Sequence, residues 1–170
     1  RGGTHDTRPY PDGPLAVYND RELRVDYAPV LEHTHLAGHA TRALSLYSGL
    51  TDLARLADAP GYWQTAERLW QDLVAKRLHI TGVVATRSGT ERIADEYELP
   101  PFGSLADTCA AAGVVDWSHR MFLASGDARY LDLLERALYN GLLSGVALAG
   151  DRFFDRIPLV SEGLLERRAY

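Results

Sequence analysis

Hydrophobic residues recur along most of this chain at spacings of three and four positions. That spacing is typical of helices that bury one face. Four stretches show it, and they are residues 30–58, 60–78, 106–124 and 127–148. Helices that follow one another through short connections form antiparallel hairpins. The pattern therefore predicts an all-α fold made of helical hairpins.

The ends of these stretches carry residues that start or break helices. Pro60 is typical of a first helical position. Ser104 or Asp107 can cap the third helix, and Asp127 can cap the fourth after a Ser-Gly break. Ser48 and the glycine that follows it predict a kink in the first helix, or its division into two.

Shorter segments between the helices have other compositions. Residues 78–87 are rich in β-branched side chains and predict a strand or a small hairpin, and residues 151–160 predict a short strand. A Pro-Pro pair predicts a loop over residues 88–104, and the glycines and prolines of residues 1–14 predict an irregular lead-in. We expect a single domain over residues 1–170, and periodicity leaves a solenoid, a bundle and a closed α/α barrel open.

Composition narrows the range of partners. The net charge is −5 and no basic patch occurs, which argues against nucleic acid as a partner. No apolar run reaches the ~20 residues that a membrane span needs. One cysteine excludes an internal disulfide framework, and with no signal peptide in the chain a cytoplasmic location is favoured. The chain begins with Arg1 and ends at Tyr170 without a tail, so we expect a fragment of a longer protein.

The residues with the most reactive chemistry gather between positions 88 and 117. Asp107 and Cys109 stand two apart at a predicted helix start, where a carboxylate and a thiol can share a metal ion and the helix dipole favours a thiolate. The alternative is a capping aspartate beside a small buried cysteine. Glu91, in the preceding loop, is either solvated or, if the loop folds over a pocket, a general acid.

Three histidines, His33, His35 and His39, occur close together in the first helical stretch. His35 and His39 are four residues apart, so on a helix they would share one face and could bind zinc. No HExxH pattern accompanies them. A histidine that faces a ligand pocket, or one buried with its hydrogen bonds satisfied, is favoured over a metal site.

Several motifs follow one another from about Asp26 to near the end of the chain. They are AGHATRALSLYSGLTDLA, WQDLVAKRLHITG, a Gly-x-Glu loop, DEYELP, a Thr-Cys-Ala-Ala run, a Trp-x-x-Arg-Met-Phe helix, GDARYLDLLERALYNGLLSG and DRFF. In this order they resemble glycoside hydrolase family 127, the β-L-arabinofuranosidase family. The resemblance implies part of an (α/α)6-barrel catalytic domain, and it favours the barrel over the solenoid and the bundle.

The resemblance also implies a chemistry. Family members are similar to retaining glycosidases that release terminal β-L-arabinofuranosyl groups with a cysteine nucleophile, activated by a zinc ion that one glutamate and three cysteines hold. Glu91 matches the general acid/base, and His39 matches a histidine that contacts the substrate. Cys109 matches a zinc cysteine, and Asp107 stands where the zinc glutamate is expected. The implied partner is a carbohydrate with terminal L-arabinofuranose, and the implied cofactor is zinc.

The chain departs from the family pattern at the zinc site. Asp107 is one methylene shorter than glutamate, although zinc–oxygen distances are short, ~2.0–2.2 Å. The nucleophile and the last zinc cysteine belong to a Cys-Cys-Pro-Pro run expected beyond Tyr170, so we expect the fragment itself to be inactive. The alternatives are a non-catalytic carbohydrate-binding barrel, a helical scaffold for protein contacts, and another (α/α)6 enzyme without metal. The exact sugar and the oligomeric state stay open.

Overall fold

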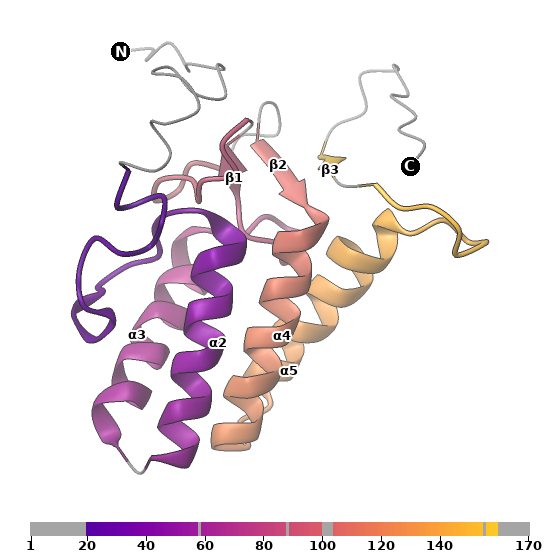
Figure 1. Cartoon of the computed structure of the whole chain (residues 1–170). Helices are drawn as coiled ribbons and strands as arrows, with labels where there is room; N and C mark the ends of the chain where they lie inside the picture. The colour runs from indigo at the N-terminus through magenta and orange to yellow at the C-terminus, as the bar shows by residue number, and fades with distance from the viewer. Residues whose placement is uncertain (1–19, 58, 88, 100–103, 155, 160–170) are drawn as a thin grey trace.

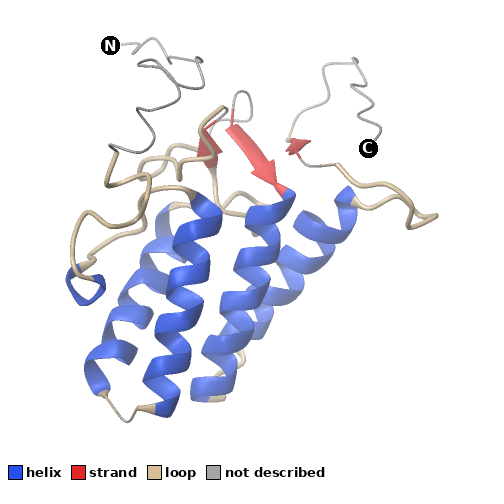
Figure 2. Ribbon diagram, viewed as in Figure 1, coloured by secondary structure: helices blue, strands red, loops and turns tan. Residues whose placement is uncertain are grey.

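The computed structural model describes residues 20–57, 59–87, 89–99, 104–154 and 156–159 (Figure 1). The predicted lead-in, residues 1–14, and the Pro-Pro pair lie outside the described residues. Four α-helices run side by side, with short β-strands gathered beyond one end of them (Figure 2). They are α2 (Ala40–Leu56), α3 (Pro60–Lys76), α4 (Thr108–Ser125) and α5 (Arg129–Ala137). The predicted all-α class is therefore confirmed.

The helices pack as two hairpins. Helix α2 lies against α3 and α4, and α4 lies against α5. Gly113 allows α2 and α4 to approach closely, because a Cβ there would lie 2.9 Å from Leu44 Cδ1. Trp117 is fully buried in α4, and its indole N–H donates a 3.0 Å hydrogen bond to Thr51 of α2. The core is formed mainly by the apolar faces of the four helices, including Ala43, Leu44, Tyr47, Leu69, Leu73, Val114, Trp117, Met121, Tyr130 and Leu133.

Several predicted helix ends are confirmed. Pro60 is the first residue of α3. The predicted division of the first helix at Ser48 is wrong, because α2 runs past this residue as one helix. Asp107 is the N-cap residue of α4, although its side chain makes no capping hydrogen bond. Gly126 ends α4 in the left-handed conformation, with φ +74°, and the Asp127 carboxylate accepts a hydrogen bond from the Arg129 N–H at the start of α5.

The predicted helix over residues 30–58 is wrong in its first third. Val30–Glu32 form one 3-10 turn, η1, and the α-helix begins only at Ala40. Gly38 accounts for the interruption, because its φ of +88° lies in the left-handed region that breaks a right-handed helix. Leu36 is fully buried outside a helix, so its apolar character was not a helical signal.

The last predicted helix, over residues 127–148, also changes its geometry. The α-helical part of α5 stops at Ala137. A π-helical turn, η2 (Leu138–Leu142), and a 3-10 turn, η3 (Leu143–Gly145), continue it. Gly141 lies in the π turn, where a Cβ would lie 2.2 Å from Val83 Cγ2. The widened turn therefore fits against the segment that connects α3 to the first strand.

In the described part of the chain, three short strands form one antiparallel sheet in the order β1-β2-β3. They are β1 (Thr86–Arg87), β2 (Ser104–Asp107) and β3 (Arg156–Pro158). Thr86 is opposite Leu105, and Asp107 is opposite Arg156. The predicted β-structure at residues 78–87 and 151–160 is confirmed in part, whereas β2 was not predicted. Because β2 leads directly into α4, the sheet fixes where that helix begins.

Within the described ranges, none of the helices combines the length and the apolar character needed to cross a bilayer.

Candidate active site

His39 and Glu91 meet at the N-terminal end of α2. His39 is the N-cap residue of that helix, and Glu91 lies in the loop after β1. The His39 Nε2 atom is 3.1 Å from Glu91 Oε2. The His39 side chain is 22% exposed and the Glu91 side chain 34% exposed, so solvent reaches both. Two residues that the sequence singled out separately are thus in direct contact.

A short backbone ladder holds this pair in place. His39 and Arg92 form an isolated antiparallel bridge. On its two sides the Ala40 N–H donates to the Glu91 carbonyl at 2.9 Å, and the Ile93 N–H donates to the Gly38 carbonyl at 2.8 Å. Glu91 has a φ of +53°, a left-handed conformation that is uncommon outside glycine and often occurs at functional sites.

The surroundings of His39 favour its neutral form. Burial lowers the pKa of His39 below its ordinary value, and this outweighs the opposing effect of the Glu91 carboxylate. The Arg42 guanidinium, one turn into α2, adds to the lowering. The His39 Nδ1 atom is buried and has no hydrogen-bond partner among the described residues. The neutral ring is therefore assigned the tautomer with its proton on Nε2. This N–H donates to the Glu91 carboxylate, and Nδ1 carries no proton.

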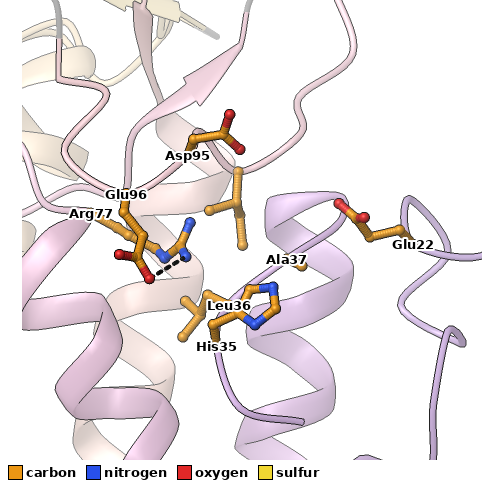
Figure 3. Close-up of a pocket in the computed structure, with 8 residues that line it drawn as sticks. Glu22, His35, Leu36, Ala37, Arg77, Asp95 and Glu96 are labelled. Atoms are coloured by element: carbon orange, nitrogen blue, oxygen red, sulfur yellow. Dashed lines mark ion pairs between the residues drawn. The ribbon is translucent and has the colours of Figure 1, made fainter.

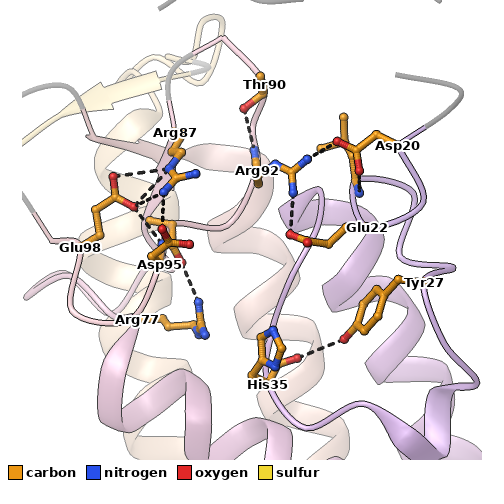
Figure 4. Close-up of polar contacts among 12 residues, drawn as sticks. Asp20, Glu22, Tyr27, His35, Arg77, Arg87, Thr90, Arg92, Asp95 and Glu98 are labelled. Atoms are coloured by element: carbon orange, nitrogen blue, oxygen red, sulfur yellow. Dashed lines mark hydrogen bonds and ion pairs between the residues drawn. The ribbon is translucent and has the colours of Figure 1, made fainter. Parts of the chain in front are cut away.

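Ion pairs flank the ladder on both sides, and Figure 4 shows them. Arg92 pairs with Asp20, and its Nη1 atom lies 2.5 Å from Glu22 Oε1. Arg87 donates to Glu98 at 2.8 Å and also pairs with Asp95. These contacts join the loop that carries Glu91 to the segment before His39 and to the turn after Ala94. The ladder is thus braced by side chains as well as by its own backbone.

Asp107 and Cys109 lie at the N-terminal end of the neighbouring helix α4. Asp107 is only 2% exposed, and its Oδ2 atom accepts a 2.5 Å hydrogen bond from the Thr86 hydroxyl. Cys109 is exposed, and the Thr41 hydroxyl lies 3.5 Å from its Sγ atom. Thr41 stands two residues after His39, so this contact joins the first turn of α2 to the first turn of α4.

The donor atoms at α4 match zinc chemistry but do not form a complete zinc site. A carboxylate oxygen and a thiolate sulfur are both ordinary zinc ligands, and a structural site needs four. Among the described residues, no three His, Cys, Asp or Glu side chains are grouped to hold a metal ion. The residues present therefore do not by themselves fit a zinc ion.

The histidine cluster of the sequence separates in the structure. His33 is fully buried, with Nδ1 3.1 Å from the Tyr47 hydroxyl and Nε2 3.1 Å from the Ala28 carbonyl. His33 is thus a buried histidine with both ring nitrogens satisfied. The expectation that His35 and His39 share a helix face is wrong, because α2 starts after both residues.

A cavity of about 370 Å³ lies beside the ladder, and Figure 3 shows its lining. His35 and Glu22 contribute from the segment before α2, and Asp95 and Glu96 contribute from the turn after the Glu91 loop. Its three carboxylates all pair with cations: Glu96, for example, lies 2.8 Å from the Lys76 ammonium. His35 therefore lines this cavity, and among the described residues no metal-binding group forms around it.

Comparison with known proteins decides the family. A model of the catalytic domain of family 127 β-L-arabinofuranosidases matches residues 15–169. This chain belongs to that family. The non-reducing end β-L-arabinofuranosidase of Bifidobacterium longum subsp. longum is 29% identical over 126 residues, which are 74% of this chain and 19% of the relative.

Solved structures of GH127 enzymes share the fold of this chain. A GH127 β-arabinofuranosidase superposes with a TM-score of 0.78 at 39% identity, over 85% of this chain and 23% of that one. A GH127 β-L-arabinofuranosidase from Geobacillus stearothermophilus T6 gives 0.83 at 33% identity, over 91% and 25%. The fold of these GH127 enzymes is an (α/α)6 barrel, so the helical hairpins are part of such a barrel. The chain spans about a fifth to a quarter of the length of these relatives.

The sequence did not reveal every residue of the site. Thr41 and Thr86, which contact Cys109 and Asp107, were not singled out, because an isolated threonine carries no spacing signal. Arg42 was also missed. Arg42 stands three residues after His39, a spacing that makes side chains neighbours on a helix surface. This spacing would have indicated their proximity if the start of α2 had been known.

Proposed function

We propose that the full-length protein is a glycoside hydrolase that releases terminal β-L-arabinofuranosyl groups. The observation that carries the proposal is the contact between His39 and Glu91, with their nitrogen and oxygen 3.1 Å apart in a solvent-accessible loop. Membership of the family and the position of Glu91 in the Gly-x-Glu loop support the assignment. The substrate is accordingly a carbohydrate with a terminal L-arabinofuranose.

Glu91 is proposed as the general acid/base of a retaining reaction. Such a residue first gives a proton to the leaving oxygen and then takes one from the attacking water. A partly exposed carboxyl can do both, because the substrate oxygen and the water reach it from solvent. The nucleophile on the opposite side of the sugar would come from outside the described residues.

His39 is proposed to orient Glu91 and to contact the sugar. A neutral imidazole with its proton on Nε2 donates to one carboxylate oxygen and fixes the plane of the carboxyl group. Its Nδ1 atom is buried, so the contact with the sugar is proposed for the part of the imidazole ring that solvent reaches, since the side chain is 22% exposed. Burial keeps the pKa of His39 low, so this arrangement persists at neutral pH.

Zinc is proposed as the cofactor, with Asp107 and Cys109 as two of its ligands. The support is that a carboxylate and a thiol are both zinc ligands and that both side chains lie at the start of α4. The Thr41 and Thr86 hydroxyls hydrogen-bond to Cys109 and Asp107 there. A bound zinc ion keeps a coordinating thiol deprotonated. The other ligands would lie outside the described residues, so no step of the reaction is derived through the metal.

A hydrolysis assay of the full-length protein tests this function. We expect release of L-arabinose from an aryl β-L-arabinofuranoside and not from the α-anomer, with the first-formed sugar in the β configuration by proton NMR. Binding of the β-anomer without hydrolysis would instead identify a non-catalytic carbohydrate-binding barrel. Hydrolysis with inversion, or of unrelated glycosides only, would contradict the proposal.

A further inference from the structure

Asp72 and Arg77 form a buried ion pair at the C-terminal end of α3. The Arg77 Nε atom lies 2.7 Å from Asp72 Oδ2, and the two residues are only 4% and 7% exposed. Buried charges are costly unless each is paired and its remaining hydrogen-bonding groups are satisfied. The other partners of this pair therefore show what it holds together.

Each member of the pair bonds to the backbone of a different segment of the candidate site. The Asp72 Oδ2 atom accepts a 2.8 Å hydrogen bond from the Leu36 N–H. The Arg77 Nη1 atom donates a 2.6 Å hydrogen bond to the Ala94 carbonyl. Leu36 stands three residues before His39, and Ala94 stands three residues after Glu91. Figure 3 shows the Arg77 side chain between these two segments.

We infer that Asp72 and Arg77 are positioning residues for the His39–Glu91 pair. The ladder that carries this pair is a single bridge with two backbone hydrogen bonds, which alone fixes the segments weakly. The ion pair adds a rigid link on the α3 side, because the guanidinium can donate to Asp72 and to Ala94 at once in a fixed geometry. The part of this inference that concerns turnover rests on the function proposed above, whereas the structural part does not.

A purely structural role for the pair makes a different prediction. If Asp72 and Arg77 only stabilised the fold, their loss would loosen the helices and the ladder alike. If they position the site, their loss opens the ladder selectively. The Ala40 and Ile93 amides report this difference, since both hydrogen-bond across the two segments. Backbone hydrogen exchange measures such local opening directly.

The test uses Arg77→Lys in the full-length protein. Lysine keeps the charge beside Asp72 but lacks the fork that also reaches Ala94. Arg68→Lys is the matched control, because Arg68 lies on the same helix and donates to the His33 carbonyl at 2.8 Å, so it anchors only one segment. Both variants are compared with the parent by hydrogen exchange and by steady-state kinetics.

We expect Arg77→Lys to speed exchange at the Ala40 and Ile93 amides by about tenfold or more, with α4 and α5 unchanged. We expect kcat to fall by up to about 100-fold with little change in KM, the effect of a misplaced catalytic group. Arg68→Lys should leave both quantities near the parent values. In a Glu91→Gln background, Arg77→Lys should add little further loss.

Two results would overturn the inference. One is unchanged exchange at both amides in Arg77→Lys, and the other is an exchange increase of the same size across all helices. If Arg77→Lys does not fold, Asp72→Asn is used, which keeps an oxygen for the Leu36 amide. If the parent protein shows no glycosidase activity, the proposed function fails, and the exchange measurement still decides the positioning role.

Discussion

The two candidate pairs lie at the N-terminal ends of neighbouring helices, but their surroundings differ. His39 and Glu91 are already in contact, on a backbone ladder braced by Arg92 and by the buried Arg77. At α4, Asp107 is bonded to a threonine hydroxyl, and Cys109 is an exposed thiol. No group of three metal ligands forms around Asp107 and Cys109 in the part of the chain that the structure describes.

The difference follows from what each half of the site requires. The acid/base proposed for Glu91 needs one carboxyl group, a residue that orients it and a local scaffold, and the described residues supply candidates for all three. A zinc centre needs four ligands that converge from several elements, and the described residues supply two candidates. The role of the His39–Glu91 pair can therefore be tested by mutation within this chain, whereas the role of Asp107 and Cys109 is tested by measuring the zinc content.

The largest expected effect is that of Glu91→Gln in the full-length protein. Removing the acid/base should lower kcat/KM by about 100- to 10,000-fold on substrates with poor leaving groups. Aryl glycosides with good leaving groups should be affected less in the first step, because they need no proton. Glu135→Gln is the control, since Glu135 is an exposed carboxylate on α5. Equal activity of Glu91→Gln and the parent would remove Glu91 from the mechanism.

The metal half of the comparison is sharpened by Cys109→Ser. Loss of a residue that only hydrogen-bonds to a metal ligand typically weakens metal binding by about 10- to 100-fold. Loss of a ligand itself should weaken zinc binding by at least that much. Thr41→Ala removes the hydroxyl beside Sγ and should have a smaller effect. Elemental analysis after dialysis against a chelator gives zinc per protein. The same zinc content in Cys109→Ser and in the parent would refute the ligand role.

A smaller effect is expected where the ladder turns into α2. Gly38 has a φ of +88°, and a Cβ there would lie 2.3 Å from the Glu22 carbonyl oxygen. Gly126 is also left-handed, but a Cβ there meets nothing within 4 Å. Gly126→Ala should lower the free energy of unfolding by about 1–2 kcal/mol, the cost of left-handed backbone. Gly38→Ala should lower the free energy of unfolding by more than this and should also lower kcat. Urea denaturation measures both variants, and equal losses of stability in Gly38→Ala and Gly126→Ala would contradict the close contact at Gly38.

The smallest effect concerns pH and the buried His33. Burial lowers the pKa of His33 below its ordinary value, so the folded protein holds it neutral. As the pH falls below about 6.5, the unfolded chain gains a proton that the folded chain does not bind, and the free energy of unfolding falls. His33→Gln should reduce this acid loss, because glutamine does not titrate. Urea denaturation of His33→Gln and of the parent at pH 8, 6 and 5 measures the change, and identical pH dependence in the two proteins would contradict the account.

Local signals in the sequence predicted the helices better than their junctions. Pro60 marked the start of α3, because proline acts on the adjacent turn. Asp107 stands at the N-cap of α4 as predicted, but its carboxylate accepts a hydrogen bond from Thr86 and makes no capping hydrogen bond. Gly38 was not read as a helix breaker, so α2 was predicted to start ten residues too early. Strand β2 pairs with segments far away in the chain, and nothing local indicates such partners.

The candidate site was predictable only in part. The resemblance to the family selected His39, Glu91, Asp107 and Cys109, and the structure brings the first two into contact. The contact itself did not follow from spacing, since it depends on the bridge between His39 and Arg92. Nor did the roles of Asp72 and Arg77, because a buried ion pair has the same sequence pattern as a solvated one.

The most direct test of the central claim, that Glu91 is the acid/base of a retaining glycosidase, is azide rescue of Glu91→Ala. Azide needs no general base, so it can attack the glycosyl-enzyme once the carboxyl is gone. With an activated aryl β-L-arabinofuranoside, we predict that azide accelerates turnover and gives the β-L-arabinofuranosyl azide, identified by NMR. No acceleration, or formation of the α-azide, would contradict the assignment of Glu91.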